Sequence, residues 1–122
     1  MTNVILVATG GAIGALLRYS STSIIKYIFP GYPLGTLLVN IIGSFCIGVL
    51  MSYTETKNFS EGFYKYFLII GILGSFTTFS AFSYEVFELI NNKKIFISFF
   101  YILTSITICL FFTYFGYNIN KI

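Results

Sequence analysis

Four long stretches with almost no charged side chains divide this chain, and they constrain its fold more than any other feature. They cover about residues 3–29, 34–53, 63–89 and 95–117, and the second contains no charged residue at all. A helix needs about 20 consecutive, mostly apolar residues to cross the hydrocarbon core of a bilayer. We therefore expect an all-α membrane protein with four transmembrane helices, forming one integral membrane domain over residues 1–122.

The chain lacks the side chains on which most catalytic and metal sites depend. It has no His and no Asp, and its two cysteines, Cys46 and Cys109, lie inside apolar stretches. Histidine triads, Asp dyads and Cys/His metal clusters are therefore excluded within one chain. We expect no enzyme activity, no organic cofactor and no nucleic-acid partner. The two thiols are interpreted as small core or lipid-facing residues rather than as a disulfide.

Lys and Arg divide almost evenly between the two sides of the predicted spans. With four spans, the side of the termini and the middle connector carries Lys57, Lys65 and Lys121, and the other side carries Lys26, Lys93 and Lys94, with Arg18 just inside the membrane. Cytoplasmic loops normally carry an excess of these residues. The balance leaves two possibilities open, namely insertion in both orientations or one orientation with a weak bias.

The first span contains small residues that predict close helix packing and a charged residue, Arg18, further along the same helix. A polar side chain inside a bilayer usually faces a bundle interior or an aqueous path. Gly10 and Gly14 form a small-residue surface that allows a neighbouring helix to approach. Arg18 lies one turn further on the same face. It either extends to the membrane surface or lines a vestibule that gathers anions.

The second span carries a polar stripe, with Thr36, Asn40, Ser44 and Gly48 at a spacing of four. That spacing places them along one helix face. Asn40 lies near the middle of the span. Its amide serves either as an interhelical hydrogen-bonding group or as a donor to a permeating anion.

The third span is the least regular, because five hydroxyl residues fall within positions 75–83 after Gly74. Hydroxyls that compete for backbone groups and adjacent β-branched threonines weaken a helix. We expect a break over about residues 74–78 at mid-membrane depth, with freed carbonyls aimed at a cation. Phe79 and Phe82 follow on one face, and they either pack in the core or line a path with their positive ring edges.

The fourth span carries a polar stripe almost along its whole length. Its members share a sector of roughly 120° at the helical period: Ser98, Tyr101, Ser105, Cys109 and Thr113. Such a ladder exceeds what helix packing usually requires. It resembles a hydrated track.

Three motifs in this order resemble the signature stretches of the CrcB/Fluc fluoride channel family. They are GGAIGALLRY at residues 10–19, GTLLVNIIGSF at 35–45 and GSFTTFSAFSYE at 74–85. The resemblance covers the whole chain. It implies a passive, fluoride-selective channel in the cell membrane, exporting cytoplasmic fluoride and reducing its toxicity, and built as a dual-topology homodimer of two inverted, lipid-embedded subunits with two pores.

The resemblance also implies roles for individual residues. The backbone carbonyls of Gly74 and Thr77 would hold a central structural Na⁺. The ion pathway would contain Asn40, Phe79, Phe82, Ser80, Tyr101, Ser105 and Thr113. Two departures from the family pattern are visible, because Ala81 stands where Thr is common and Cys109 where a hydroxyl is expected.

A small four-span multidrug exporter driven by protons is the alternative reading. Proton coupling requires an ionisable residue embedded in a span. The first span has no carboxylate, and Glu85 and Glu88 lie near the end of the third. We therefore favour the channel.

Overall fold

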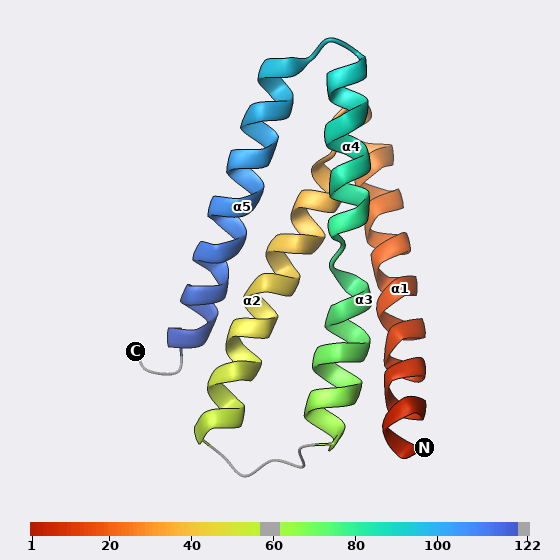
Figure 1. The fold of residues 1–122 in the computed structure, drawn as a ribbon, viewed down its shortest axis with the longest axis vertical. Coiled ribbons are helices and arrows are strands. Elements are labelled where there is room, and N and C mark those ends of the chain that lie inside the picture. Colours follow the sequence, from red (N-terminus) through yellow and green to blue (C-terminus); the bar gives the residue numbers. More distant parts are fainter. Residues whose placement is uncertain (57–61, 120–122) are drawn as a thin grey trace.

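The computed structural model describes residues 1–56 and 62–119, and most of these residues are helical (Figure 1). In chain order they are α1 (Thr2–Ile28), α2 (Leu34–Thr56), the π-helix η1 (Phe63–Leu73), α3 (Gly74–Phe76), α4 (Phe79–Asn91) and α5 (Ile95–Asn118). Four helical segments are long and apolar enough to cross a membrane: Thr2–Ile28, Leu34–Glu55, Phe63–Asn91 and Ile95–Asn118. The expectation of an all-helical protein with four such segments is confirmed.

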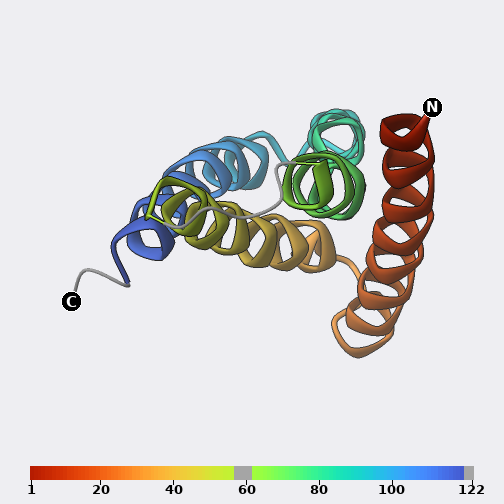
Figure 2. The ribbon, with the colours of Figure 1, turned by 90° about the horizontal axis from the view of Figure 1, so that it is seen from below.

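The segments alternate in direction, so that the start of α1 and the end of α5 lie at the same end of the molecule (Figure 1). Viewed from below, α1 stands at one side and α5 at the other, with η1 and α2 between them (Figure 2). Lys57 and Lys121, two of the cations counted on the side of the termini, lie outside the described residues.

Local backbone geometry explains where two helices end. The turn after α1 contains Gly31 with a φ of +96°, and the turn after α4 contains Lys93 with a φ of +63°. The Lys94 N–H donates to the Leu89 carbonyl at 2.8 Å, and the Lys93 N–H donates to the Ile90 carbonyl at 3.0 Å. These two bonds form a Schellman cap, which satisfies carbonyls at the end of α4.

Glycines allow the helices to approach backbone to backbone. A Cβ placed on Gly14 of α1 would overlap the carbonyl oxygen of Ile72, and one on Gly10 would reach that of Phe67 in η1. In the same way, a Cβ on Gly48 of α2 would overlap the Thr113 carbonyl of α5. The packing role predicted for the glycines of the first span is therefore present, and it joins α1 to η1.

Gly14→Val is expected to separate α1 from η1 and to lower stability by about 1–3 kcal/mol, the usual cost of overpacking. The physical reason is that the backbone of Ile72 cannot move aside as a side chain does. The measurement is the midpoint of thermal aggregation in detergent. Gly11→Ala is the matched control, because its new Cβ would meet only the Ser75 hydroxyl, at 3.2 Å, which can rotate away. Equal midpoints for Gly14→Val and the unsubstituted protein would contradict the packing account.

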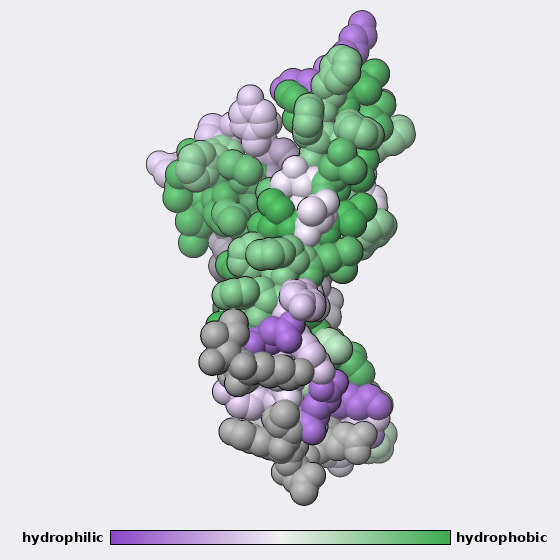
Figure 3. Space-filling view, turned by 90° about the vertical axis from the view of Figure 1, so that its left-hand side faces the viewer, coloured by the Kyte–Doolittle hydropathy of each residue, from purple (hydrophilic) through white to green (hydrophobic). Residues whose placement is uncertain are grey.

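The interior of one chain is small, and much of its apolar surface faces outward. The buried apolar side chains are Val39, Phe76, Phe82, Leu89 and Tyr101, whereas many large apolar side chains on every long helix are exposed. One face shows hydrophobic residues over its middle and hydrophilic residues toward its ends (Figure 3). Such a surface fits an apolar medium or a second chain rather than water.

Candidate functional site

The third membrane-spanning segment is interrupted between α3 and α4 (Figure 1). Thr77 has φ −84° and ψ 155°, and Thr78 has φ −150° and ψ 121°, so both residues are extended. Residues 74–76, which the sequence included in the expected break, are helical. Thr78 begins α4 as its N-cap, because its Oγ1 accepts a hydrogen bond from the Ala81 N–H at 3.1 Å.

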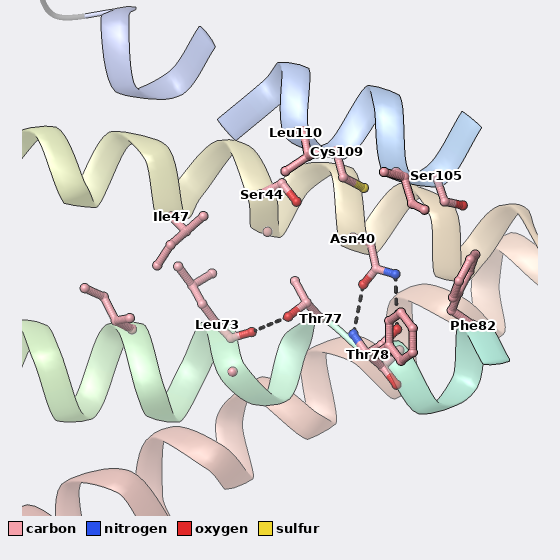
Figure 4. A pocket seen from close by; sticks show the side chains of 15 residues that line it. Asn40, Ser44, Ile47, Leu73, Thr77, Thr78, Phe82, Ser105, Cys109 and Leu110 are labelled. Atoms are coloured by element: carbon pink, nitrogen blue, oxygen red, sulfur yellow. Dashed lines mark hydrogen bonds between the residues drawn. The ribbon is translucent and has the colours of Figure 1, made fainter. Parts of the chain in front are cut away.

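Asn40 on α2 holds the extended backbone through two hydrogen bonds (Figure 4). Its Oδ1 accepts from the Thr78 N–H at 2.8 Å, and its Nδ2 donates to the Thr78 carbonyl at 3.2 Å. One side-chain amide therefore satisfies both backbone groups of Thr78. Of the two roles considered for Asn40, the interhelical one is present in the structure.

These bonds divert two donors from their usual helical acceptors. In a continuous helix the Thr78 N–H donates to the Gly74 carbonyl, and the Ala81 N–H donates to the Thr77 carbonyl. Here the first donates to Asn40 and the second to the Thr78 side chain. The carbonyls of Gly74 and Thr77 thus lose the partners that a helix would provide.

A cavity of about 460 Å³ lies beside the interruption, between α2, α5 and the third segment (Figure 4). It brings together six of the residues singled out in the sequence: Asn40, Gly74, Thr77, Phe79, Phe82 and Ser105. Ser44 and Cys109, members of the two polar stripes, also line it. Cys109, which was expected to be a small core or lipid-facing residue and not part of a disulfide, is a free, half-buried thiol that lines this cavity.

The two phenylalanines occupy different environments although they are neighbours. Their ring centroids lie 5.4 Å apart at an interplanar angle of 50°. Phe82 is 7% exposed and packs against Tyr101, with centroids 5.1 Å apart, whereas Phe79 is 76% exposed. One ring is fixed in the core, and the other projects from the surface of the single chain.

Three residues of the predicted pathway lie outside this cavity. The Ser80 hydroxyl is 3.2 Å from Oγ1 of Thr78. The Tyr101 hydroxyl donates to Glu85 at 3.3 Å. Thr113 donates to the Cys109 carbonyl of its own helix at 3.0 Å, so this hydroxyl is engaged with backbone.

A second cavity, of about 540 Å³, lies on the other side of Thr78, which lines both. Charged residues of both signs surround it, and they are Arg18, Lys26, Glu85 and Glu88. The Nε of Arg18 donates to the Ser75 carbonyl at 3.0 Å. Arg18 is therefore tied to the end of α3 as well as facing a polar space.

Thr78 has a central part in the site that its place in the sequence did not predict. Thr78 pairs with Asn40, caps α4 and lines both cavities. A local signal for the cap was available, because a Thr directly before an apolar helical run is a typical N-cap. The pairing with Asn40 spans 38 positions and has no such local signal.

Together the fold and the site define a class, a multi-pass helical membrane protein with an interrupted span beside an open cavity. A model of the family described as "CrcB-like protein, Camphor Resistance (CrcB)" matches residues 5–117. The chain belongs to the CrcB family, which confirms the resemblance of its three motifs.

Relatives of similar length carry the name "Fluoride-specific ion channel FluC". The protein of Flavobacterium psychrophilum is 39% identical over 122 residues, which cover 99% of this chain and 98% of the relative. That of Campylobacter fetus subsp. fetus is 42% identical, with coverages of 99% and 95%. That of Methanococcus vannielii is 44% identical, with coverages of 99% and 98%. The family is one of ion channels, so the chain is not an enzyme, and its place is in a membrane.

Proposed function

We propose that this chain forms a passive, fluoride-selective channel in the cell membrane that lets cytoplasmic fluoride leave the cell. The observation that carries the proposal is the cavity beside Thr78, where Asn40, Ser105 and the phenylalanine pair line one space. Relatives named as fluoride-specific channels, 39% to 44% identical over nearly the whole chain, support the choice of ion.

The cavity offers replacements for the water that a small anion sheds. Ser105 is 7% exposed, and among the described residues its Oγ has no hydrogen-bond partner. A buried hydroxyl without a partner costs about 1–3 kcal/mol, and an anion that accepts a hydrogen bond from it offsets this cost. The edges of aromatic rings carry partial positive charge, so Phe79 and Phe82 favour an anion at the same place.

The other pathway residues extend this route. Tyr101 and Thr113 flank Ser105 along α5, and Ser80 lies at the start of α4 beside Thr78. Arg18 and Lys26 offer cationic groups to an anion in the second cavity, and Glu85 and Glu88 around the same cavity offset part of their attraction. The membrane potential supplies the driving force, since it contributes about 2.3 kcal/mol per charge for every 100 mV. Export needs no chemical energy source, because fluoride that enters as neutral HF and dissociates inside leaves as an anion.

A structural Na⁺ at the interruption is part of the proposal. The carbonyls of Gly74 and Thr77 have lost their helical donors, and hard cations prefer oxygen ligands. No group of three His, Cys, Asp or Glu side chains comes together within residues 1–56 and 62–119, so carbonyls are the ligands we assign. A bound cation would also attract anions toward the adjacent cavity.

An inverted second copy completes the proposed channel. One chain leaves Phe79 76% exposed beside the cavity, together with much apolar surface, and a partner would cover both. The even division of Lys and Arg permits insertion in both orientations, which such a homodimer requires.

Removing Na⁺ is expected to lower both fluoride efflux and thermal stability, because a ligand that binds only the folded dimer stabilises it by mass action. The purified protein would be exchanged into N-methylglucamine salts, and its aggregation midpoint and efflux rate measured. Adding Na⁺ back should restore both. Equal midpoints and rates with and without Na⁺ would contradict the proposed cation site.

Fluoride efflux from liposomes also separates the channel from a proton-coupled exporter. A passive channel requires only a counter-ion path, such as valinomycin with K⁺, and no proton gradient. The exporter reading predicts transport that depends on a proton gradient and on an embedded carboxylate, for which Glu85 is the candidate in the third segment. A multidrug exporter predicts no fluoride efflux with or without a proton gradient, so that result from folded protein would contradict the channel.

A further inference from the structure

Arg18 of α1 makes a hydrogen bond that the proposed ion path does not use. Its Nε donates at 3.0 Å to the carbonyl of Ser75, the middle residue of α3. The contact is partly buried and joins residues 57 positions apart. Arg18 therefore binds the backbone directly before the interruption of the third segment.

The Ser75 carbonyl lies between the two carbonyls that we assign to Na⁺. In a continuous helix the carbonyls of residues 74–77 accept from the N–H groups of residues 78–81. The donors for Gly74 and Thr77 bond elsewhere, as described above. The carbonyl of Ser75 instead accepts from a guanidinium of another helix. Arg18 thus occupies the carbonyl next to the proposed ligands and leaves the ligands themselves open.

α1 is a firm support for this guanidinium, because glycines bring the helix against the third segment. A Cβ added to Gly14, one helical turn before Arg18, would overlap the Ile72 carbonyl oxygen. A Cβ added to Gly11 would lie 3.2 Å from the Ser75 hydroxyl. α1 packs along both η1 and α3 (Figure 1). The end of α3 is therefore held from α1, whereas Asn40 holds the following extended backbone from α2.

We propose that Arg18 is a positioning residue for the cation site, because it fixes the end of α3 and with it the carbonyls of Gly74 and Thr77. The proposal rests on the Na⁺ site proposed above. With Asn40 on one side of the interruption and Arg18 on the other, the carbonyls between them keep a fixed arrangement. Ligands that are ordered in advance bind more tightly, since less ordering is required on binding.

The charge of Arg18 predicts the opposite effect from its hydrogen bond, so the two are separable. A guanidinium repels a cation bound nearby, and removing the charge alone would strengthen Na⁺ binding. Removing the hydrogen bond frees the end of α3, and carbonyls that must be ordered on binding hold Na⁺ more weakly. Weaker Na⁺ binding by a neutral variant therefore identifies positioning rather than charge.

The test measures the aggregation midpoint of the full-length protein in detergent as a function of Na⁺, with N-methylglucamine as the replacement cation. The midpoint rises once Na⁺ exceeds its dissociation constant, so the onset of the rise reports the affinity. For Arg18→Ala and Arg18→Gln we expect an onset at Na⁺ concentrations at least about fivefold higher, which is the lower end of the usual coupling between linked sites. Arg18→Lys keeps a charged donor and should lie closer to the unsubstituted protein.

Lys26→Gln is the matched control. Lys26 lines the second cavity together with Arg18 and carries the same charge, but within residues 1–56 and 62–119 no hydrogen bond joins it to α3. Its onset should stay close to that of the unsubstituted protein. A merely structural role of Arg18 would lower the midpoint equally at every Na⁺ concentration and leave the onset in place.

An unchanged or earlier onset in Arg18→Ala and Arg18→Gln would overturn the proposal. An equally displaced onset in Lys26→Gln would overturn it too, because the effect would then belong to the charge of the cavity. If Arg18→Ala does not yield folded protein, Arg18→Gln and Arg18→Lys decide in its place. Absence of any Na⁺ dependence in the unsubstituted protein contradicts the proposed cation site itself, and this result is obtained without any variant.

Discussion

Fluoride efflux is expected to fall about ten- to a hundredfold when Phe79 or Phe82 is replaced by isoleucine. A hydrogen bond to a charged group contributes about 1.5–3 kcal/mol, and we take the contact of a ring edge with an anion as comparable. Each 1.36 kcal/mol in a barrier changes a rate tenfold. Isoleucine keeps an apolar side chain at each position but has no positive ring edge to present to an anion. Efflux from liposomes, followed with a fluoride electrode, measures the effect.

The two substitutions control for each other because the rings differ in burial. Phe82 is 7% exposed, so its replacement also leaves a small void and costs about 1 kcal/mol of stability. Phe79 is 76% exposed in the single chain, so its replacement should leave the fold of that chain intact. Loss of flux in Phe79→Ile with an unchanged elution volume would assign the effect to the ring. Unsubstituted rates in both variants would remove the phenylalanines from the path.

Asn40→Ala is expected to abolish efflux and to lower the aggregation midpoint. The substitution leaves the half-buried N–H and carbonyl of Thr78 without their partner, at a cost of up to about 1–3 kcal/mol each. Asn40→Asp separates the two bonds, because a carboxylate still accepts from the Thr78 N–H but cannot donate to the carbonyl. We therefore expect the aggregation midpoint of Asn40→Asp to lie between those of the unsubstituted protein and Asn40→Ala.

The control for Asn40 is Ile42→Ala on the same helix, since Ile42 is 51% exposed. It should leave the midpoint and the efflux rate close to those of the unsubstituted protein. If Asn40→Ala unfolds at the same temperature as Ile42→Ala, the paired hydrogen bonds to Thr78 do not hold the interruption in place.

The helices were predictable from the sequence because their signals are local. Long apolar runs between polar turns specify spans, and Gly10 and Gly14 at a spacing of four specify a close helix contact. The angular position of Ser105 on its helix likewise follows from the helical period alone. Such features depend only on the length of an apolar run and on helical spacing, which are properties of about twenty neighbouring residues.

The partners of the polar groups were not predictable, because they depend on rotamers and on distant segments. The helical period predicts Thr113 on the polar stripe, but its hydroxyl bonds to its own helix backbone. The Tyr101 hydroxyl turns to Glu85, and the Arg18 guanidinium reaches Ser75, 57 positions away. A stripe shows which side chains share a face, whereas the site is defined by which atoms they meet.

The most direct test of the central claim compares fluoride and chloride efflux from liposomes that contain only this protein, in Na⁺ and with valinomycin as the K⁺ path. The account predicts rapid fluoride efflux and chloride efflux no faster than from protein-free liposomes. Equal rates for the two halides would contradict selectivity. Absence of fluoride efflux from folded, Na⁺-supplied protein would contradict the channel itself.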